Sequence, residues 1–358
     1  MESHRGCVLL VTLSIFLGGC RQVVEQDFFM DSLSYVGMCP VSPLILDDSI
    51  STSSTLQMSY IVDSLIISIN NRGQEYAFGI SNIYTGQLLG LYGRRGRSFN
   101  EMLDCLPVMD TYRNKDEELC SDIFSFGDGR LFIWNISQSL NSASDSYEDI
   151  IKLYNDEDRY SFLSLYHLDD TSVVVKNSRQ TASDEIIADA PRYEIYDLRT
   201  GGLVRYFNIF KRVYVKTDDP VYTSKSFLGN FDCIKPDRTK LAFGMGYMPV
   251  YGILDLETGK FNGFKIKTLK HFSTSVRNWH FCNLVADDYY IYALYYGDDI
   301  SDSRAERKHS TLFVIDWDGN ITARYDLGKY FTELKLNDSI LYFIRNGEKI
   351  HSISLTEL

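Results

Sequence analysis

The sequence predicts an all-β protein: a six-bladed β-propeller with four-stranded antiparallel blades, closed by an N-terminal strand. Three observations support this prediction: short apolar runs separated by tight turns, two kinds of turn that recur along the chain, and no helical period between them. Tyr (25) and Phe (21) are abundant and Pro (7) is scarce, which suits strands. With 358 residues, 44% of them hydrophobic, the chain can bury a large core.

The clearest single blade lies between Phe231 and Lys267. Four apolar runs follow one another, and the turns Lys-Pro-Asp-Arg and Asp-Leu-Glu-Thr-Gly end the first and the third of them. Proline and aspartate favour such turns, and glycine supplies a positive φ. Four short strands with tight turns indicate one antiparallel sheet.

The closing turn of this blade recurs along the chain. Its glycines are Gly86, Gly201, Gly259 and Gly319, which are 115, 58 and 60 residues apart, so one copy near residue 143 has lost its turn. The acidic turn of the first hairpin recurs too, at Asp63, Asp128, Asp170, Asp237, Asp288 and Asp338. Two turn series in one phase predict six blades.

In chain order, the predicted blades span residues 56–92, 119–154, 160–207, 226–266, 278–327 and 333–355. In the second blade a polar loop, Ser137–Ser146, follows a clear hairpin. The sixth has only three strands, and we expect the N-terminal segment Tyr35–Leu46 to supply the fourth. Such closure ties the termini together and removes exposed sheet edges. We expect no long helix, and Thr332–Lys335 is the one stretch where a helix competes with a strand.

The N-terminus resembles a lipoprotein signal peptide. Val8–Leu17 is an apolar run too short to span a bilayer, and it ends in Leu-Gly-Gly-Cys, similar to the bacterial lipobox. Acyl chains on Cys20 would tether the protein to a membrane without spanning it. The alternative is an ordinary signal peptide with a chance cysteine. We therefore predict a signal peptide at 1–19, a disordered tether at 20–32 and the propeller at 33–358.

Charge and cysteine content exclude several classes. A net charge of −12 without a stripe of Lys and Arg argues against nucleic acid as a partner. The chain has no C-x-x-C pair, so no zinc site is indicated. Cys105 and Cys120 could pair in an oxidising periplasm, whereas Cys233 and Cys282 fall on inner strands and are expected to be buried.

The long connections are predicted to share one face of the ring: the loops between second and third strands and the links between blades. Long loops on a rigid scaffold commonly carry function, so we expect the binding site there, at the mouth of the central channel. Trp279, Tyr247 and Tyr296 could stack on sugars or belong to the core. The candidate binding residues are Arg94, Arg97, Asn100, Glu101, Arg179, Tyr247 and Arg277.

The most distinctive loop is Gly93–Leu103, with the sequence Gly-Arg-Arg-Gly-Arg-Ser-Phe-Asn-Glu-Met-Leu. It resembles the Gly-Arg-Gly-Pro-Asn-Glu-Phe-Leu motif that follows the first blade in the TolB-like six-bladed propeller lipoproteins of Bacteroidota. The matching residues are Gly96, Arg97, Asn100, Glu101 and Leu103, and the sequence departs from the motif at Ser98, Phe99 and Met102. This resemblance implies a lipid-anchored envelope protein with no assigned chemistry.

The loop has two interpretations. Its three arginines could grip a carboxylate or a phosphate, since guanidinium groups suit planar anions. Alternatively, Arg97 and Glu101 pair and hold the loop against blade two.

No motif in the sequence points to catalysis. There is no nucleophile elbow, no P-loop, no paired histidines and no calcium-loop spacing, so we predict no catalytic residues, cofactor or metal. The favoured hypothesis is a monomeric, lipid-anchored propeller of the cell envelope that binds an envelope protein or a glycan. The alternatives are a hydrolase or lyase acting on glycans, its site assembled from several blades, and a structural scaffold in an envelope complex.

Overall fold

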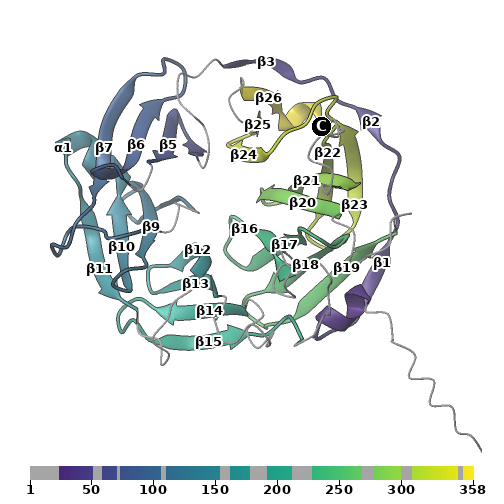
Figure 1. Cartoon of the computed structure of the whole chain (residues 1–358), viewed down its shortest axis with the longest axis horizontal. Helices are drawn as coiled ribbons and strands as arrows, with labels where there is room; N and C mark the ends of the chain where they lie inside the picture. The colour runs from purple at the N-terminus through teal and green to yellow at the C-terminus, as the bar shows by residue number, and fades with distance from the viewer. Residues whose placement is uncertain are drawn as a thin grey trace, which may run out of the picture.

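Six small β-sheets surround a central channel in the computed structural model (Figure 1). The structure describes residues 24–50, 59–70, 73–105, 110–153, 162–177, 192–211, 228–267, 278–299, 309–345 and 350–358. Within each blade, neighbouring strands are antiparallel, and the four strands lie side by side from the channel to the outer rim. The predicted six-bladed propeller with four-stranded blades is confirmed.

The strands of the first three blades, from the channel outward, are β4 (Ser59–Val62), β5 (Leu65–Ile69), β6 (Tyr76–Asn82) and β7 (Leu88–Arg94); β8 (Tyr112–Arg113), β9 (Leu119–Ser125), β10 (Arg130–Asn135) and β11 (Tyr147–Lys152); and β12 (Phe162–Asp169), β13 (Ser172–Asn177), β14 (Arg192–Asp197) and β15 (Leu203–Phe207). Those of the last three are β16 (Asn230–Ile234), β17 (Lys240–Met245), β18 (Val250–Asp255) and β19 (Phe261–Ile266); β20 (Asn278–Ala286), β21 (Tyr290–Asp299), β22 (Thr311–Asp316) and β23 (Ile321–Asp326); and β24 (Glu333–Asn337), β25 (Ile340–Ile344), β26 (Ile350–Ser354) and β3 (Asp47–Ile50).

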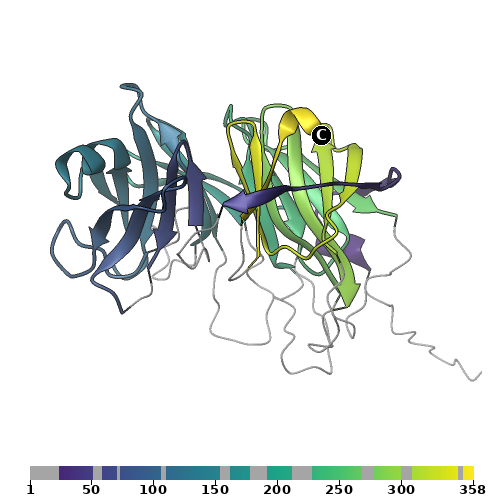
Figure 2. The same ribbon diagram turned by 90° about the horizontal axis from the view of Figure 1, so that it is seen from above.

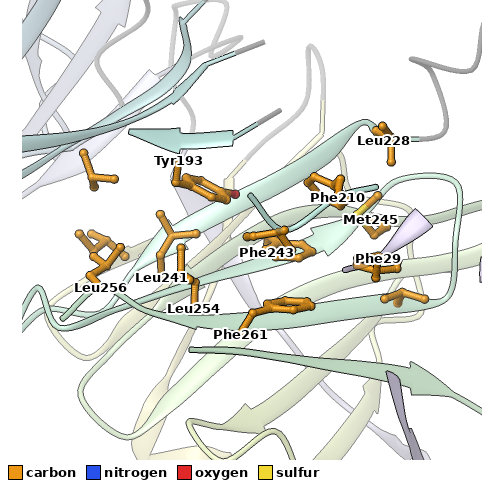
Figure 3. Close-up of a cluster of buried hydrophobic side chains, with 14 of the residues drawn as sticks. Phe29, Tyr193, Phe210, Leu228, Leu241, Phe243, Met245, Leu254, Leu256 and Phe261 are labelled. Carbon is orange, nitrogen blue, oxygen red and sulfur yellow. The ribbon is translucent and has the colours of Figure 1, made fainter. Parts of the chain in front are cut away.

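The core lies between neighbouring blades, so strands are buried on both faces. In β17, Leu241 and Phe243 pack toward blade three, whereas Ala242 packs toward blade five. This explains why the strands are continuously apolar rather than alternating. Figure 3 shows the cluster on the blade-three side, where Phe243 and Phe261 stack with ring centroids 5.7 Å apart.

The N-terminal segment 24–50, here called the strap, runs around the outside of the ring (Figure 2). Its strand β1 (Leu33–Val36) adds in parallel to β19, and β2 (Ser42–Pro43) adds in parallel to β23. Only β3 completes blade six, by pairing antiparallel with β26. Closure by an N-terminal strand is confirmed, but the predicted segment Tyr35–Leu46 was wrong, because those residues lie along blades four and five.

The first described part of the strap is ordered, although the sequence suggested a disordered tether up to Ser32. Glu25–Phe28 forms a 3₁₀-helix, η1. Phe28 and Phe29 are fully buried, and the ring of Phe29 stacks on Phe261 at 6.0 Å. Two large apolar side chains in the core offset the entropy of ordering this segment.

Blade two departs from the predicted phase. The hairpin at Asp128 joins the second and third strands, not the first and second. The true first turn is 114–118, where Glu117 has φ 60°, as Asp63 and Asp338 have φ 51° in the equivalent turns. The stretch Ser137–Ser146, predicted as a polar loop between the second and third strands, joins the third and fourth instead, and most of the short helix α1 (Ile136–Ser142) lies in it. The lost turn predicted near residue 143 corresponds to this connection, in which Ala143, with φ 53°, is the C-cap of α1.

In blades three, four and five, one carboxylate shapes the closing turn. Asp255 Oδ1 accepts the Thr258 backbone N–H and hydroxyl, both at 2.7 Å, and Asp197 binds Thr200 in the same way. The backbone N–H of Thr258 is the main cause that lowers the pKa of Asp255. A lowered pKa in the folded state gives stability that is present above the unfolded-state pKa and is lost as pH falls through the folded-state value.

We therefore predict that Asp255→Asn lowers the free energy of unfolding at pH 7, and that the difference from the parent narrows as pH falls from 6 toward 3. Urea unfolding at each pH measures it. The control is Asp170→Asn, which changes an exposed neighbour of the turn carboxylate Asp169. A difference that grows toward low pH would contradict this account of the turn.

Candidate functional site

The loop Gly93–Leu103 folds back on itself between blades one and two. Arg95 and Met102 form an isolated bridge, and the Gly96 N–H donates to the Met102 carbonyl at 3.0 Å. Met102 is fully buried in the core between these blades. The loop is therefore anchored by an apolar side chain at its base, while Arg97, Phe99 and Asn100 are exposed at its tip.

Glu101 is the polar centre of this loop. Its carboxylate accepts the Ser98 N–H at 2.9 Å, which is the main cause that lowers its pKa. Arg94 Nε lies 3.8 Å from the same carboxylate, so the cation beside Glu101 is Arg94 where the sequence suggested Arg97. From blade two, Arg130 donates to the Glu101 carbonyl at 2.8 Å. A side chain at position 96 would displace the Glu101 carboxylate from its present place.

We predict that Glu101→Ala lowers Tm by about 2 °C or more, because the Ser98 N–H and the Arg94 guanidinium both lose their carboxylate. The matched change Arg97→Ala, at the exposed tip of the same loop, leaves Tm unchanged. Differential scanning calorimetry of both variants measures this. An equal fall in Tm for the two variants would contradict the assignment of Glu101 as the residue that holds the loop.

A second group of residues forms an aromatic mouth, defined here as Phe231, Tyr247, Trp279, Tyr296 and Tyr330. The rings of Tyr247 and Trp279 lie nearly parallel with centroids 6.4 Å apart, and Phe231 stacks on Trp279 at 6.5 Å. Tyr296 meets Trp279 edge-on at 6.1 Å and stacks on Tyr330 at 4.8 Å. All five side chains are partly exposed.

The fold explains why these rings meet. Trp279 is the second residue of β20, Tyr247 lies in the loop between β17 and β18, and Tyr330 lies in the link that leads to β24. These positions belong to the side of the ring that carries second-to-third loops and blade links. The indole N–H of Trp279 donates to the Phe281 carbonyl at 2.9 Å, which fixes the ring and leaves its face to the other aromatics. The arrangement offers stacking surfaces held in fixed positions.

The predicted binding residues thus fall into separate places. Arg94, Arg97, Asn100 and Glu101 share the loop between blades one and two, whereas Tyr247 belongs to the aromatic mouth at blades four and five. Arg179, Arg277 and Cys20 lie outside the described residues. The sequence singled out Trp279, Tyr247 and Tyr296 but not Tyr330 or Phe231. The sequence signal that could have identified them is an aromatic residue near a strand end, next to a long connection.

A cavity of about 240 Å³ lies in the channel. Its wall includes Tyr60, Asp110, Tyr166, Asp232 and Lys335. Around the channel, acids and bases occur in pairs, most of them joining different blades: Asp63 with Arg113, Asp110 with Arg238, Asp122 with His167, Asp232 with Lys176, and Glu333 with Lys335.

Asp232 has the most completely satisfied carboxylate of this set. Lys176 Nζ lies 2.9 Å from it, and the hydroxyls of Ser164, Tyr166 and Tyr193 each donate to it at 3.0 Å. All four donors come from blade three, and the carboxylate comes from blade four. Burial, with the nearby charge of Asp232 as the next cause, raises the pKa of both tyrosines, so they remain donors. The group therefore joins two blades rather than presenting a reactive carboxylate.

His167 and Asp122 form a pair of the type seen in acid–base catalysis, with Nδ1 2.9 Å from the carboxylate. The other carboxylate oxygen of Asp122 accepts the Tyr112 hydroxyl at 2.9 Å. The Tyr112 ring also covers the imidazole at 3.5 Å between centroids. Both carboxylate oxygens are thus occupied and one imidazole face is covered, so the geometry suits a structural joint between blades two and three.

The described residues contain no group of three or more His, Cys, Asp or Glu side chains that could hold a metal ion. Cys105 forms an isolated backbone β-bridge with Ser125, at one end of β9, whereas Cys120 lies at the other end of this strand. The suggested disulfide between Cys105 and Cys120 therefore does not form. Cys233 and Cys282 are buried, as predicted, and burial raises the pKa of both thiols. Among the helices of the described ranges, none is long and apolar enough to cross a membrane.

These features define a six-bladed β-propeller with a polar, internally paired channel and an aromatic mouth. No protein-family model matches the chain, and no curated protein does either. Among solved structures, the chain is similar to a member of the DUF4221 family from Bacteroides vulgatus, at 12% identity and a TM-score of 0.58, covering 86% of this chain and 96% of that one.

Two further propellers align less closely. Regucalcin from Agrobacterium tumefaciens, described as a calcium-binding protein, is 13% identical, with a TM-score of 0.46 and coverage of 90% of this chain and 95% of that one. BamB from Moraxella catarrhalis is 13% identical, with a TM-score of 0.36 and coverage of 82% and 80%. At these identities the similarity extends to the fold alone.

We predict that Lys176→Met destabilises the protein by about 3 kcal/mol, because it leaves the buried Asp232 carboxylate without its cation. The double variant Lys176→Met with Asp232→Asn costs less than the sum of the single changes, since it leaves neither charge unpaired. Denaturant unfolding of the parent, the two single variants and the double variant measures the four free energies of unfolding. Arg199→Ala, which removes one partner of an exposed pair, is the control and changes stability by less than about 0.5 kcal/mol. If the losses of the two single variants simply add in the double variant, Lys176 and Asp232 are not coupled and this account is wrong.

Proposed function

We propose that this protein is a lipid-anchored propeller of the cell envelope that binds a glycan or a partner protein at the aromatic mouth. Acylation of Cys20 after removal of residues 1–19 would supply the anchor. The observation that supports binding is the meeting of Tyr247, Trp279 and Tyr330 from three blades, all partly exposed. The lipobox-like sequence and the fold shared with a Bacteroides propeller are consistent with an envelope lipoprotein.

Aromatic side chains at a surface serve binding in two ways. A sugar ring stacks on an indole or phenol face through its C–H groups, and a partner protein buries the same rings as anchors of an interface. Rings packed only for stability would be enclosed by neighbouring side chains, as Trp134 is between blades one and two, where it is 1% exposed. Trp279, in contrast, remains partly exposed among four other partly exposed rings.

We predict that Trp279→Ala weakens binding about 30-fold, the effect expected when a central aromatic anchor is removed. The measurement combines a glycan array with crosslinking capture of envelope proteins from the native host, and affinity for the ligand found is then determined by calorimetry. The control is Tyr289→Ala, because Tyr289 is 75% exposed in the turn between β20 and β21 on the other side of the ring.

Equal affinity of the Trp279 variant and the parent would contradict the site at the mouth. The loop hypothesis is tested in the same assay by Arg97→Ala with Asn100→Ala. Binding lost in this variant but kept in Trp279→Ala would move the site to the loop between blades one and two.

A further inference from the structure

The strap carries more than its share of exposed apolar side chains. Of the eighteen large hydrophobic residues exposed among the described ones, six lie between residues 24 and 45. Met30, Tyr35 and Ile45 are 52%, 64% and 89% exposed, and the others are Val24, Met38 and Val41. Scattered exposed apolar residues are normal, but a concentration along one short segment indicates a contact surface.

The strap also has a defined position on the ring. It follows the outer edges of blades four, five and six, so its exposed side chains lie along one side of the disc (Figure 1). Its buried side is fully engaged, because Phe28 and Phe29 enter the core and Glu25 pairs with Lys265 at 2.7 Å. Among the apolar side chains that face outward, the ring of Tyr35 also meets Lys265 Nζ at 5.4 Å, and the part of each that is exposed remains available for contact.

The length of chain before the strap limits what can cover this surface. Val24 follows Cys20 by four residues, which span at most about 14 Å when fully extended. A lipid on Cys20 would therefore hold the strap side of the disc close to the bilayer. Acids on the strap, such as Asp27 and Asp31, give no attraction to anionic headgroups, so apolar contact is the available source of binding.

We propose that the exposed apolar side of the strap rests on the lipid surface, so that the disc stands edge-on to the membrane. This proposal depends on the lipid anchor of the proposed function. Tyr35, Met38 and Ile45 contact the region between headgroups and acyl chains, where aromatic and aliphatic side chains are favourable. Contact is independent of salt and occurs on zwitterionic lipid.

The test uses the mature chain with a hexahistidine tag in place of residues 1–20, bound to phosphatidylcholine vesicles that contain a nickel-chelating lipid. The strap has its own reporter, the partly exposed Cys39, which takes an environment-sensitive fluorophore in a Cys105→Ser background. The matched reporter is Leu89→Cys with Cys39 and Cys105 replaced by Ser, because Leu89 is exposed on β7 at the outer edge of blade one. Lipids with brominated acyl chains quench a fluorophore that touches the bilayer.

We expect quenching at Cys39 and none at position 89. The substitutions Tyr35→Ser, Met38→Ser and Ile45→Ser together abolish quenching while the tag still holds the protein on the vesicle. The matched set Leu88→Ser and Leu91→Ser leaves quenching intact. No quenching at Cys39, or equal quenching at both reporters, overturns the edge-on orientation.

A separate measurement keeps this proposal distinct from the anchor. Mass spectrometry of the N-terminal peptide from native membranes shows whether Cys20 carries acyl chains, with Cys20→Ala as the control. An unmodified Cys20 would refute the lipid anchor, while the vesicle experiment would still show whether the strap contacts lipid. An acylated Cys20 with an unquenched Cys39 would refute the surface and leave the anchor standing.

Discussion

Closure of the ring depends on the pairing between β3 and β26. Ile50 lies opposite Ile350, so one ladder joins residues three hundred positions apart. Without β3, blade six would have three strands, and the N-terminal and C-terminal parts of the chain would not meet in one sheet. The strap reaches this position only because its earlier part is fixed along blades four and five. Contacts this distant in sequence slow folding, since the ring closes only after most blades exist.

The blades are joined by two kinds of contact, one in the body of the ring and the other near the channel. In the body of the ring, large apolar side chains such as Phe243 and Trp134 fill the spaces between sheets. Near the channel, where the first strands converge and water can enter, acid–base pairs take over. Each buried charge there has a partner, as the cost of isolated charges in a protein interior requires. The joint at Asp232 shows how specific such contacts are, since four donors from one blade fit one carboxylate of the next.

The sequence was informative where structure is local and periodic. The turn glycines at 86, 201, 259 and 319 all have positive φ, and the two turn series correctly fixed the number of blades. The error in blade two has a physical cause: β8 is two residues long, too short to show an apolar pattern, so the next strand was taken as the first. The first turn of that blade also carries its positive φ at Glu117 rather than at an aspartate or glycine.

The site was harder to predict because it is assembled from several blades. Tyr247, Trp279 and Tyr330 are separated by tens of residues, and nothing in their local sequence says that their rings meet. The same holds for Lys176 and Asp232, whose only signal was a charged residue inside an otherwise apolar strand. One of the two interpretations of the Gly93–Leu103 loop had Arg97 and Glu101 pair to hold it. In the structure the cation beside Glu101 is Arg94, since the backbone turn at Ser98 places the carboxylate beside the earlier arginine.

The position of the strap and that of the aromatic mouth have a joint consequence. A propeller that rested on one face would press that mouth of its channel against the membrane, and any ligand there would need to be lipid. A disc that stands on its edge leaves both mouths open sideways. The mouth with Trp279 belongs to blades four, five and six, the blades that the strap follows, so in the proposed orientation it would open close to the bilayer and parallel to it. Such a site reaches glycans and proteins that are held in the same membrane more readily than those free in solution, because a shared membrane raises their effective concentration.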